Sequence, residues 1–475
     1  MENNKFKLSS FKDARKRSRN TTSILKYEFD DEYLNIFKGK KYYLVTYGCQ
    51  GNVVDGEKID YILERLGFEK VIDAQSSDII VLNTCAIREN ATNRVYGELG
   101  RFKALKKLNP NLIIAVGGCM PQLEFETTKI REKYRQVDIL FGTHNINFLA
   151  KYIVECINEK KKMYEVFSCE GDIVENNGIN RSNKYFGYVN IMYGCDEFCS
   201  YCIVPYTRGK ERSRLKDDIL REVDELIKNG YKEICLLGQN VNAYGKDFES
   251  NNYLFSDLLS DLMLTKIRRV RFTTSHPKDL DDKTIQLIGK GNIMPHLHLP
   301  VQSGSNHILK KMNRKYTCED YISKIEYLRK CCPNVSLTTD IIVGFPGESE
   351  EDFNYTMELV KKCDFEGAYT FIYSPRKGTP SALFENKIDI DIAHKRLLIL
   401  NDLINQGFLK GNNRFINSIE EVLVVGKTTK NDSLYYGYTK NNKLVNFEGD
   451  DSLIGSIINI EITKAFTWHL RGKIV

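Results

Sequence analysis

The chain has 475 residues, of which 42% are hydrophobic and 28% charged, a composition typical of globular proteins rather than disordered or fibrous ones. Its length, about three times that of a common domain, predicts two to four domains. No apolar run reaches the roughly 18–20 residues that would span a membrane, and the polar N-terminus lacks the apolar stretch of a signal peptide. We therefore expect a cytoplasmic protein without a membrane partner. The net charge of +6 permits an RNA partner without indicating one.

The first 40 residues form a predicted extension with a basic run at 12–19. A flexible arm is the expectation for such a run, and an arm that contacts RNA is the alternative. From residue 41, apolar strand-like runs at 42–47, 78–82, 112–116 and 137–141 alternate with amphipathic helical patterns. This alternation predicts an α/β domain with a parallel sheet over residues 41–168.

Each of the first three predicted strands ends in a cysteine: Cys49, Cys85 and Cys119. We call these the strand-end cysteines. The carboxyl ends of parallel strands lie on one edge of the sheet, where ligands bind in open α/β folds. Disulfides seldom persist in the cytoplasm, so grouped cysteines there favour metal binding. We expect these three to hold an iron–sulfur cluster with one open iron; chance placement of buried cysteines is the alternative.

A polar segment without periodicity predicts a linker at 169–184. Strand-like runs then recur at 188–192, 233–237, 270–274, 296–300, 336–343 and 368–373, each followed by a helical pattern. These six units predict a partial (β/α)6 barrel over residues 185–409. Short strands and turns in the remaining residues, 410–475, predict a small OB-like all-β barrel. From residue 413 on, eight basic residues oppose seven acidic ones, so this barrel is nearly neutral.

A second cysteine group, Cys195, Cys199 and Cys202, follows the first strand of the partial barrel in a turn that contains Gly194. We call these the loop cysteines. Three thiolates on a four-iron cubane leave one iron without a protein ligand, and that iron can chelate S-adenosylmethionine (SAM). A structural zinc site normally requires a fourth ligand, and no cysteine or histidine lies close by in the sequence. An open cluster that performs catalysis is therefore the prediction.

The spacing C-x3-C-x2-C, with Tyr201 before the last cysteine, is similar to the signature of the radical SAM superfamily. Over residues 41–475 the chain resembles the methylthiotransferase family within it, and the C-terminal barrel resembles the TRAM domain, an RNA-binding module. Besides the cysteines, the resemblance rests on the segments PYTRGKERSR at 205–214, LLGQNVNAYG at 236–245, PHLHLPVQSGS at 295–305, DIIVGFPGE at 340–348 and YSPRKGT at 373–379.

The resemblance implies a tRNA substrate that carries N6-isopentenyladenosine at position 37, next to the anticodon, and a product with a methylthio group on carbon 2 of that base. An aryl hydrogen at that carbon is inert to side-chain chemistry, so a cofactor must supply the reactive agent. The family uses two [4Fe-4S] clusters and SAM, both as radical source and as methyl donor. It also implies an external electron donor such as flavodoxin or ferredoxin, and we expect a monomer.

Candidate SAM-binding residues lie near the ends of the predicted barrel strands. Glycines allow close approach of the backbone to the adenosyl group, and polar side chains there can bind its amino, carboxylate or ribose groups. A structural role is the alternative for each. We predict that Arg208, with Arg212 and Arg214, binds phosphate or a cofactor carboxylate; a solvated basic loop is the alternative. The other candidates are Gln239, Ser275, Gln302, Asp340, Gly344 and Gly347.

Three rival functions remain open in the sequence. Two are methylthiotransferases, one acting on threonylcarbamoyladenosine in tRNA and the other on an aspartate of a ribosomal protein; the QNVN string at 239–242 argues against both. The third is a non-catalytic iron–sulfur protein that binds RNA and carries electrons. Such a protein would not need an open iron.

Overall fold

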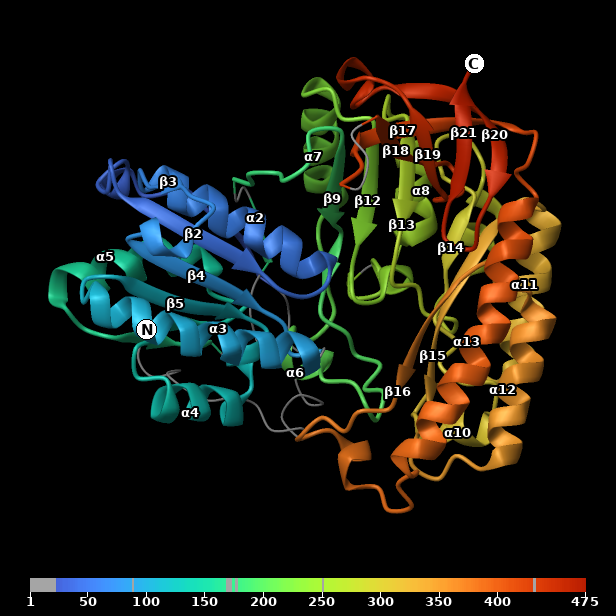
Figure 1. The fold of residues 1–475 in the computed structure, drawn as a ribbon, viewed down its shortest axis with the longest axis horizontal. Coiled ribbons are helices and arrows are strands. Elements are labelled where there is room, and N and C mark those ends of the chain that lie inside the picture. Colours follow the sequence, from blue (N-terminus) through green and yellow to red (C-terminus); the bar gives the residue numbers. More distant parts are fainter. Residues whose placement is uncertain (1–22, 88, 168–172, 176–177, 250–251, 430–432) are drawn as a thin grey trace. The chain divides into compact units, whose positions relative to one another are not determined.

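The computed structural model describes residues 23–87, 89–167, 173–175, 178–249, 252–429 and 433–475 (Figure 1). The chain forms two compact units. The first comprises residues 1–182, 192–198 and 202–214, and the second comprises residues 183–191, 199–201 and 215–475. Among the described residues, no helix is both long and apolar enough to cross a membrane.

The first unit is built on a six-stranded sheet in the order β3-β2-β4-β5-β6-β7, and every neighbouring pair is parallel. All four runs that were predicted for residues 41–168 form strands of this sheet, which confirms the predicted α/β class. The strands are β2 (Lys41–Thr46), β3 (Glu69–Lys70), β4 (Ile79–Thr84), β5 (Ile113–Gly118), β6 (Ile139–Phe141) and β7 (Met163–Glu165).

Helices cover both faces of this sheet, because successive strand residues point to opposite sides. Ile79 and Val81 pack in one core with α2 (Gln50–Arg65) and α5 (Leu149–Glu159). Ile80 and Leu82 pack in the other core with α3 (Glu89–Leu108) and α4 (Glu124–Lys133). Figure 1 shows α2 and α3 on opposite sides of β4 and β5. Burial on both faces explains why these strands are continuously apolar.

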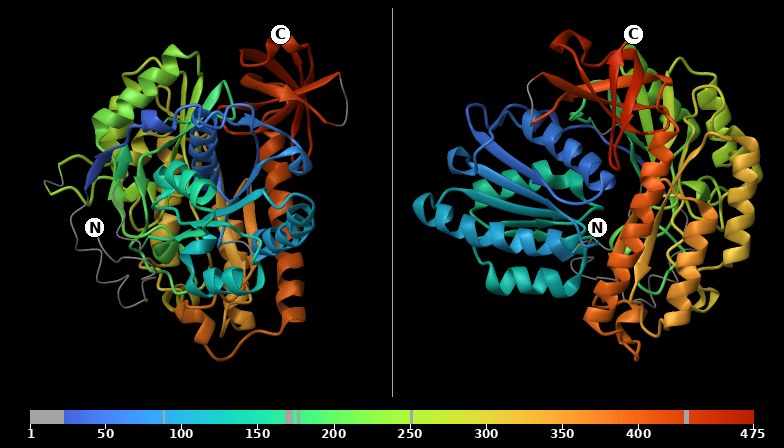
Figure 2. Two further views of the ribbon diagram at one scale, coloured as in Figure 1. Left: turned by 90° about the vertical axis from the view of Figure 1, so that its left-hand side faces the viewer. Right: turned by 45° about the vertical axis from the view of Figure 1, so that its right-hand side comes forward.

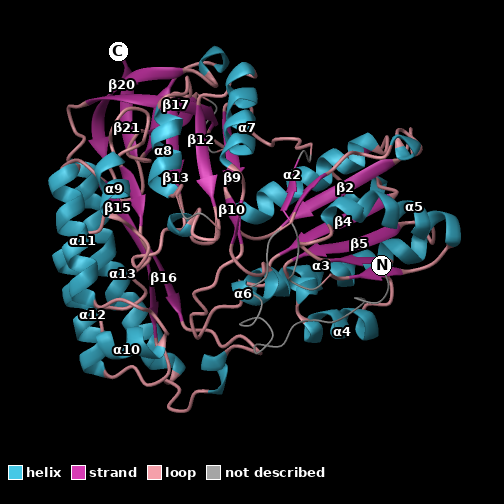
Figure 3. Cartoon of the chain, turned by 180° about the vertical axis from the view of Figure 1, so that it is seen from behind, coloured by secondary structure: helices cyan, strands magenta, loops and turns pink. Residues whose placement is uncertain are grey.

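The second unit contains a partial barrel of six parallel strands, as predicted. One three-stranded sheet has the order β13-β12-β9, and another has the order β14-β15-β16. An isolated parallel bridge joins Val270 on β13 to Ile293, which precedes β14 in the chain. Figure 3 shows β9, β12 and β13 side by side. The strands are β9 (Phe186–Asn190), β12 (Glu233–Leu237), β13 (Arg269–Phe272), β14 (His296–His298), β15 (Ser336–Val343) and β16 (Ala368–Ile372).

Helices connect these strands, and several begin at clear sequence signals. Thr317 and Ser349 each accept a hydrogen bond from the backbone of the third helical residue, which is an aspartate that caps in return. These capping boxes fix the starts of the helices that flank β15. The connecting helices are α7 (Lys216–Lys228), α8 (Phe255–Met263), α9 (Asp282–Leu287), α10 (Asn306–Lys311), α11 (Cys318–Cys331), α12 (Glu350–Cys363) and α13 (Ile390–Asn413).

After α13 the chain forms a closed five-stranded barrel in the order β17-β18-β19-β21-β20 (Figure 2). Its core includes Tyr435, Phe447 and Ile460, so Tyr435 is a core residue rather than a free stacking surface. The sequence missed β21, because charges at Arg471 and Lys473 interrupt its apolar pattern. The strands are β17 (Ile419–Lys427), β18 (Leu434–Thr439), β19 (Leu444–Glu448), β20 (Ile457–Ala465) and β21 (Leu470–Ile474).

The predicted extension and linker are described only in part. The basic run at 12–19 lies outside the described residues. Further along, β1 (Ile24–Lys26) pairs in parallel with β8 (Ile173–Glu175), so the end of the extension and the predicted linker meet in a small two-stranded sheet. The sequence showed no signal for this pairing, because three-residue strands are too short to display a period.

Candidate metal and cofactor sites

The strand-end cysteines lie where three neighbouring strands end. Cys49 caps α2 directly after the β2 strand and its turn, Cys85 follows β4, and Cys119 follows β5. The register pairs Thr84 with Gly118, the residues just before two of these cysteines. The backbone N–H of Cys119 donates to the Thr84 carbonyl oxygen over 2.8 Å, which ties the second and third turns together.

Two glycines allow these turns to approach closely. Gly48 has a φ of +129°, and a Cβ atom on it would lie 2.8 Å from the Cβ of Cys85. Gly118 has a φ of +95°, and its Cβ would lie 2.4 Å from the Thr84 carbonyl oxygen. Neither conformation nor space suits a larger residue. The glycines before Cys49 and Cys119 therefore serve to bring the three cysteines to one place.

A buried asparagine joins the three turns. Asn52 is fully buried; its Nδ2 donates to the Thr84 carbonyl oxygen over 3.0 Å and lies 4.0 Å from the Sγ of Cys119. The Sγ of Cys49 lies 3.4 Å from its Oδ1. The sequence reasoning missed Asn52, although its position three residues after Cys49 at a helix start was an available signal.

Burial affects the Cys119 thiol most directly. The pKa of the Cys119 thiol is raised to about 12, chiefly by burial; Arg208 opposes the rise, and the neighbouring Cys85 and Cys49 add to it. A coordinating metal deprotonates a thiol outright, even one whose pKa burial has raised. Three sulfurs at one sheet edge fit a four-iron cluster that keeps one iron open.

Arg208 reaches the same group. Its Nε donates to the Cys119 Sγ over 3.2 Å, and its guanidinium forms an ion pair with Asp55 at 2.6 Å. Burial opposes its charge, but Asp55, Cys119 and Cys49 hold the pKa of Arg208 well above its ordinary value. Arg208 was predicted to bind phosphate or a cofactor carboxylate. Its guanidinium instead contacts a thiol and a buried carboxylate of the chain. Asp55, also missed by the sequence reasoning, lies on α2 one turn beyond Asn52.

The loop cysteines lie between β10 (Met192–Tyr193) and α6 (Val204–Thr207). Cys195 and Cys202 belong to the first unit and Cys199 to the second. Within the first unit, the Cys195 N–H donates to the Gly209 carbonyl oxygen over 3.1 Å. A Cβ on Gly194, whose φ is +77°, would lie 1.8 Å from the Lys210 carbonyl oxygen. The turn before Cys195 therefore requires glycine.

Within the second unit, a buried arginine contacts Cys199. The Arg314 guanidinium lies 3.5 Å from the Cys199 Sγ and also donates to the Tyr316 hydroxyl and to the Pro300 carbonyl oxygen over 2.8 and 2.9 Å. Each cysteine group thus has one thiol that accepts from a buried arginine. No local sequence pattern indicated Arg314, because it lies 115 positions from Cys199 in the chain.

Substitution of Gly194 by alanine tests the geometry of this turn. We expect Gly194→Ala to displace Cys195 and to lower bound iron to the level of a Cys195→Ala chain, since both the φ and the Lys210 contact oppose a side chain. Gly230→Ala is the matched control, because Gly230 has a φ of +84° with nothing near its Cβ position. It should cost about 1–2 kcal/mol of stability and keep its iron. Equal iron in both variants would contradict the prediction.

The predicted SAM residues of the second unit lie near barrel strand ends, with one exception. Gln239 follows β12, and Ser275 follows β13. Gln302 bridges to Ile341. Asp340 was expected at a strand end, but it lies inside β15, because that strand runs on to Val343. There its Oδ1 lies 3.4 Å from the Nε2 of His298, a neighbour that the sequence reasoning did not include.

Backbone strain and an unsatisfied hydroxyl occur in the segments that follow β13 and β14. Thr274 and Gln302 have φ values of +70° and +72°, which are rare for residues with side chains and cluster at functional sites. Among the described residues, the buried Ser275 Oγ has no hydrogen-bond partner. These features fit a polar ligand at the ends of β13 and β14.

The glycine turn after β15 is locked by a buried ion pair. The Gly344 N–H donates to Glu348 Oε2 over 2.8 Å, and Arg396 pairs with the same carboxylate at 2.8 Å. Gly344 and Gly347 have φ values of +71° and +84°. A Cβ on Gly347 would lie 2.1 Å from the Lys311 Nζ. Both positions therefore require glycine, because the backbone conformation and the adjacent atoms of the chain leave no room for a side chain.

Models of three known families match separate parts of the chain. The Radical SAM superfamily model matches residues 189–360, the model of Uncharacterized protein family UPF0004 matches residues 41–142, and the TRAM domain model matches residues 413–475. The chain is thus a radical SAM enzyme, and this class implies a [4Fe-4S] cluster and SAM.

The curated relatives specify the family. The tRNA-2-methylthio-N(6)-dimethylallyladenosine synthase of Bacillus cytotoxicus is 50% identical over 98% of this chain and 92% of its own length. The enzyme of that name from Bacillus thuringiensis is 49% identical over the same shares. The chain therefore belongs to the tRNA-2-methylthio-N(6)-dimethylallyladenosine synthase family.

Solved structures support the fold alone. The radical S-adenosylmethionine methyltransferase TsrM from Kitasatospora setae, solved with cobalamin and a [4Fe-4S] cluster, aligns over 72% of this chain and 74% of its own, with a TM-score of 0.53 and 12% identity. A second structure of that enzyme, with tryptophan and a SAM analogue, gives a TM-score of 0.51 at 13% identity.

Proposed function

We propose that the chain converts N6-isopentenyladenosine at position 37 of tRNA to 2-methylthio-N6-isopentenyladenosine by radical SAM chemistry. The observation that carries the proposal is 50% identity to a synthase of that name along 98% of the chain. Two separate groups of three cysteines support it, because replacement of an aryl hydrogen by a methylthio group requires both a radical source and a sulfur carrier.

In this proposal each cysteine group holds one [4Fe-4S] cluster with one open iron. The loop cysteines would hold the cluster whose chemistry is electron donation to SAM, and the strand-end cysteines would hold the cluster whose chemistry is provision of sulfur. The radical-generating cluster is held by three thiolates and no fourth, those of Cys195, Cys199 and Cys202. The sulfur-supplying cluster is held by Cys49, Cys85 and Cys119, and the glycine turns and Asn52 set the spacing of their sulfurs.

The barrel residues bind and orient SAM. Polar groups of Gln239, Ser275, Gln302 and Asp340 bind its amino, carboxylate and ribose groups, and Ser275 is favoured by its unsatisfied hydroxyl. The turn at Gly344 and Gly347 admits the adenosyl group against bare backbone. The Glu348–Arg396 pair keeps that turn rigid, so that the bound cofactor does not have to organise it.

The partners in this proposal are tRNA and an electron donor of the flavodoxin or ferredoxin type, and the chain acts as a cytoplasmic monomer. The C-terminal barrel is a second reason to expect tRNA, because the TRAM domain that it matches is an RNA-binding module. Trp468 is 63% exposed there and is suited to stack on a base. Because the barrel is nearly neutral, such contacts would depend on aromatic placement rather than on bulk charge.

The test is mass spectrometry of tRNA nucleosides from a strain that lacks this chain. We expect 2-methylthio-N6-isopentenyladenosine to disappear and N6-isopentenyladenosine to accumulate, with restoration by the intact chain but not by Cys119→Ala. The methylthio derivative of threonylcarbamoyladenosine and the modified ribosomal aspartate serve as controls and should not change. Retention of 2-methylthio-N6-isopentenyladenosine in the deletion strain would refute the proposal.

A further inference from the structure

We propose that Arg208 is a positioning residue for the cluster on the strand-end cysteines, and that Arg208 and Asp55 shift the reduction potential of this cluster in opposite directions. The inference rests on the proposed function, because it presumes a cluster at these cysteines. By this inference, the segment that follows the loop cysteines also provides a side chain beside the cluster on the strand-end cysteines.

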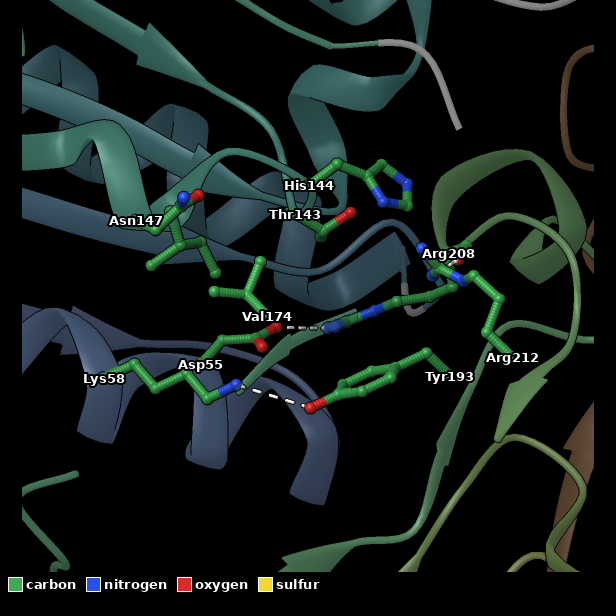
Figure 4. A pocket seen from close by; sticks show the side chains of 10 residues that line it. Asp55, Lys58, Thr143, His144, Asn147, Val174, Tyr193, Arg208 and Arg212 are labelled. Atoms are coloured by element: carbon green, nitrogen blue, oxygen red, sulfur yellow. Dashed lines mark hydrogen bonds and ion pairs between the residues drawn. The ribbon is translucent and has the colours of Figure 1, made fainter. Parts of the chain in front are cut away.

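The contacts are direct and buried. Arg208 uses Nε toward the Cys119 Sγ at 3.2 Å and a terminal nitrogen toward Asp55 at 2.6 Å. The exposed fractions are 7% for Arg208, 4% for Asp55 and 1% for Cys119. In Figure 4, Asp55 extends from α2 toward the Arg208 guanidinium, and a dashed line marks the ion pair. The guanidinium thus connects a carboxylate on one side with a ligand sulfur on the other.

The backbone around Arg208 holds this arrangement in place. Its N–H donates to the Val204 carbonyl oxygen over 2.8 Å at the end of α6, and its own carbonyl oxygen accepts from Arg212 over 2.9 Å. Nearby, the Thr143 hydroxyl donates to the Thr207 carbonyl oxygen over 2.8 Å. Because the backbone is held by these hydrogen bonds, the Arg208 side chain has little freedom, and its N–H groups approach the thiolate from a defined direction.

The buried charges have opposite effects on reduction. A reduced cluster carries one more negative charge, so an N–H donor and a positive charge at a ligand sulfur stabilise it and raise the potential. Asp55 places a negative charge on the far side of the same guanidinium and offsets part of that effect. Removal of Arg208 should therefore lower the potential, and neutralisation of Asp55 should raise it.

A neighbouring ion pair provides a matched control. Arg214 lies in the same segment, is 7% exposed, and pairs with the buried Glu175 through contacts of 2.6 and 2.7 Å. In the described structure neither residue of this pair contacts a strand-end cysteine. Arg214→Gln removes the same kind of buried pair and should leave the potential unchanged.

The experiment uses the full chain with Cys195, Cys199 and Cys202 replaced by alanine, so that only the strand-end cluster assembles after reconstitution with iron and sulfide. Its potential is measured by titration with dithionite, followed by electron paramagnetic resonance. We expect a lower potential in Arg208→Gln, a higher one in Asp55→Asn, and an intermediate one in Arg208→Lys, which keeps the charge but loses the Nε–H donor.

The outcomes separate this inference from the proposed function. If the parent chain assembles no cluster, the second cluster of the proposed function is wrong and this inference falls with it. If the parent holds a cluster whose potential is the same in Arg208→Gln and Asp55→Asn, only this inference is overturned. If Arg208→Gln loses its cluster, Asp55→Asn decides alone, and an unchanged or lower potential there would refute it.

Discussion

Alanine at Cys195, Cys199 or Cys202 is expected to reduce formation of 5′-deoxyadenosine from SAM to background, because each change removes one of three ligands from the proposed radical-generating cluster. Loss of an outer-shell partner alone costs about 10–100-fold in metal affinity, so loss of a ligand should cost more. Alanine at Cys49, Cys85 or Cys119 should leave 5′-deoxyadenosine formation intact and abolish the methylthiolated product. The measurement is chromatography of both products after reduction with dithionite.

Cys331→Ala is the control for this prediction. Cys331 lies on α11 and is only partly buried, and no strand end or cluster motif includes it. It should keep both products. If both cysteine groups caused the same loss of 5′-deoxyadenosine, the division between radical source and sulfur carrier would be wrong. If neither group affected it, the loop cysteines would not hold the radical-generating cluster.

The second large effect is expected for stability, at the junction of the C-terminal barrel with β13. Arg269 is 1% exposed and donates to the Tyr438 and Glu421 carbonyl oxygens over 2.9 and 2.6 Å. Glu233 lies 3.8 Å away. Removing one partner from a buried ionic network costs about 3–5 kcal/mol. Arg269→Ala should therefore lower the urea midpoint of the barrel by more than about 1 M.

The fluorescence of Trp468, the single tryptophan in the sequence, is the readout. It lies in the C-terminal barrel, and its ring packs 4.9 Å from that of Phe408 on α13, so it senses unfolding at this junction. Arg268→Ala is the control: that side chain is 63% exposed and lies 3.4 Å from Glu421, a surface pair worth less than about 1 kcal/mol. Equal midpoints for the two variants would show that Arg269 does not secure the barrel.

Much of the fold follows from local pattern. The main strands of the parallel sheets were predictable because burial on two faces leaves continuous apolar runs with glycine or polar turns after them. The strands that were missed, such as β3 and β21, are short or carry charges at the sheet edge. Asp340 was placed at a strand end although the predicted run, 336–343, has the same bounds as β15; the extent of the strand was right, and only the position of this residue within it was wrong.

By itself, the sequence determined the two cysteine groups, their place after parallel strands, and the family, because those features depend on residue type and spacing within single segments. Only the tertiary structure decided what surrounds the cysteines. Asn52 and Arg208 reach Cys119 through folding of distant segments, and Asp55 pairs with that arginine. A contact between residues so far apart in the chain leaves no mark on local periodicity. The same holds for Arg314 at Cys199. Buried charges must find partners, and only the fold shows which partners they have.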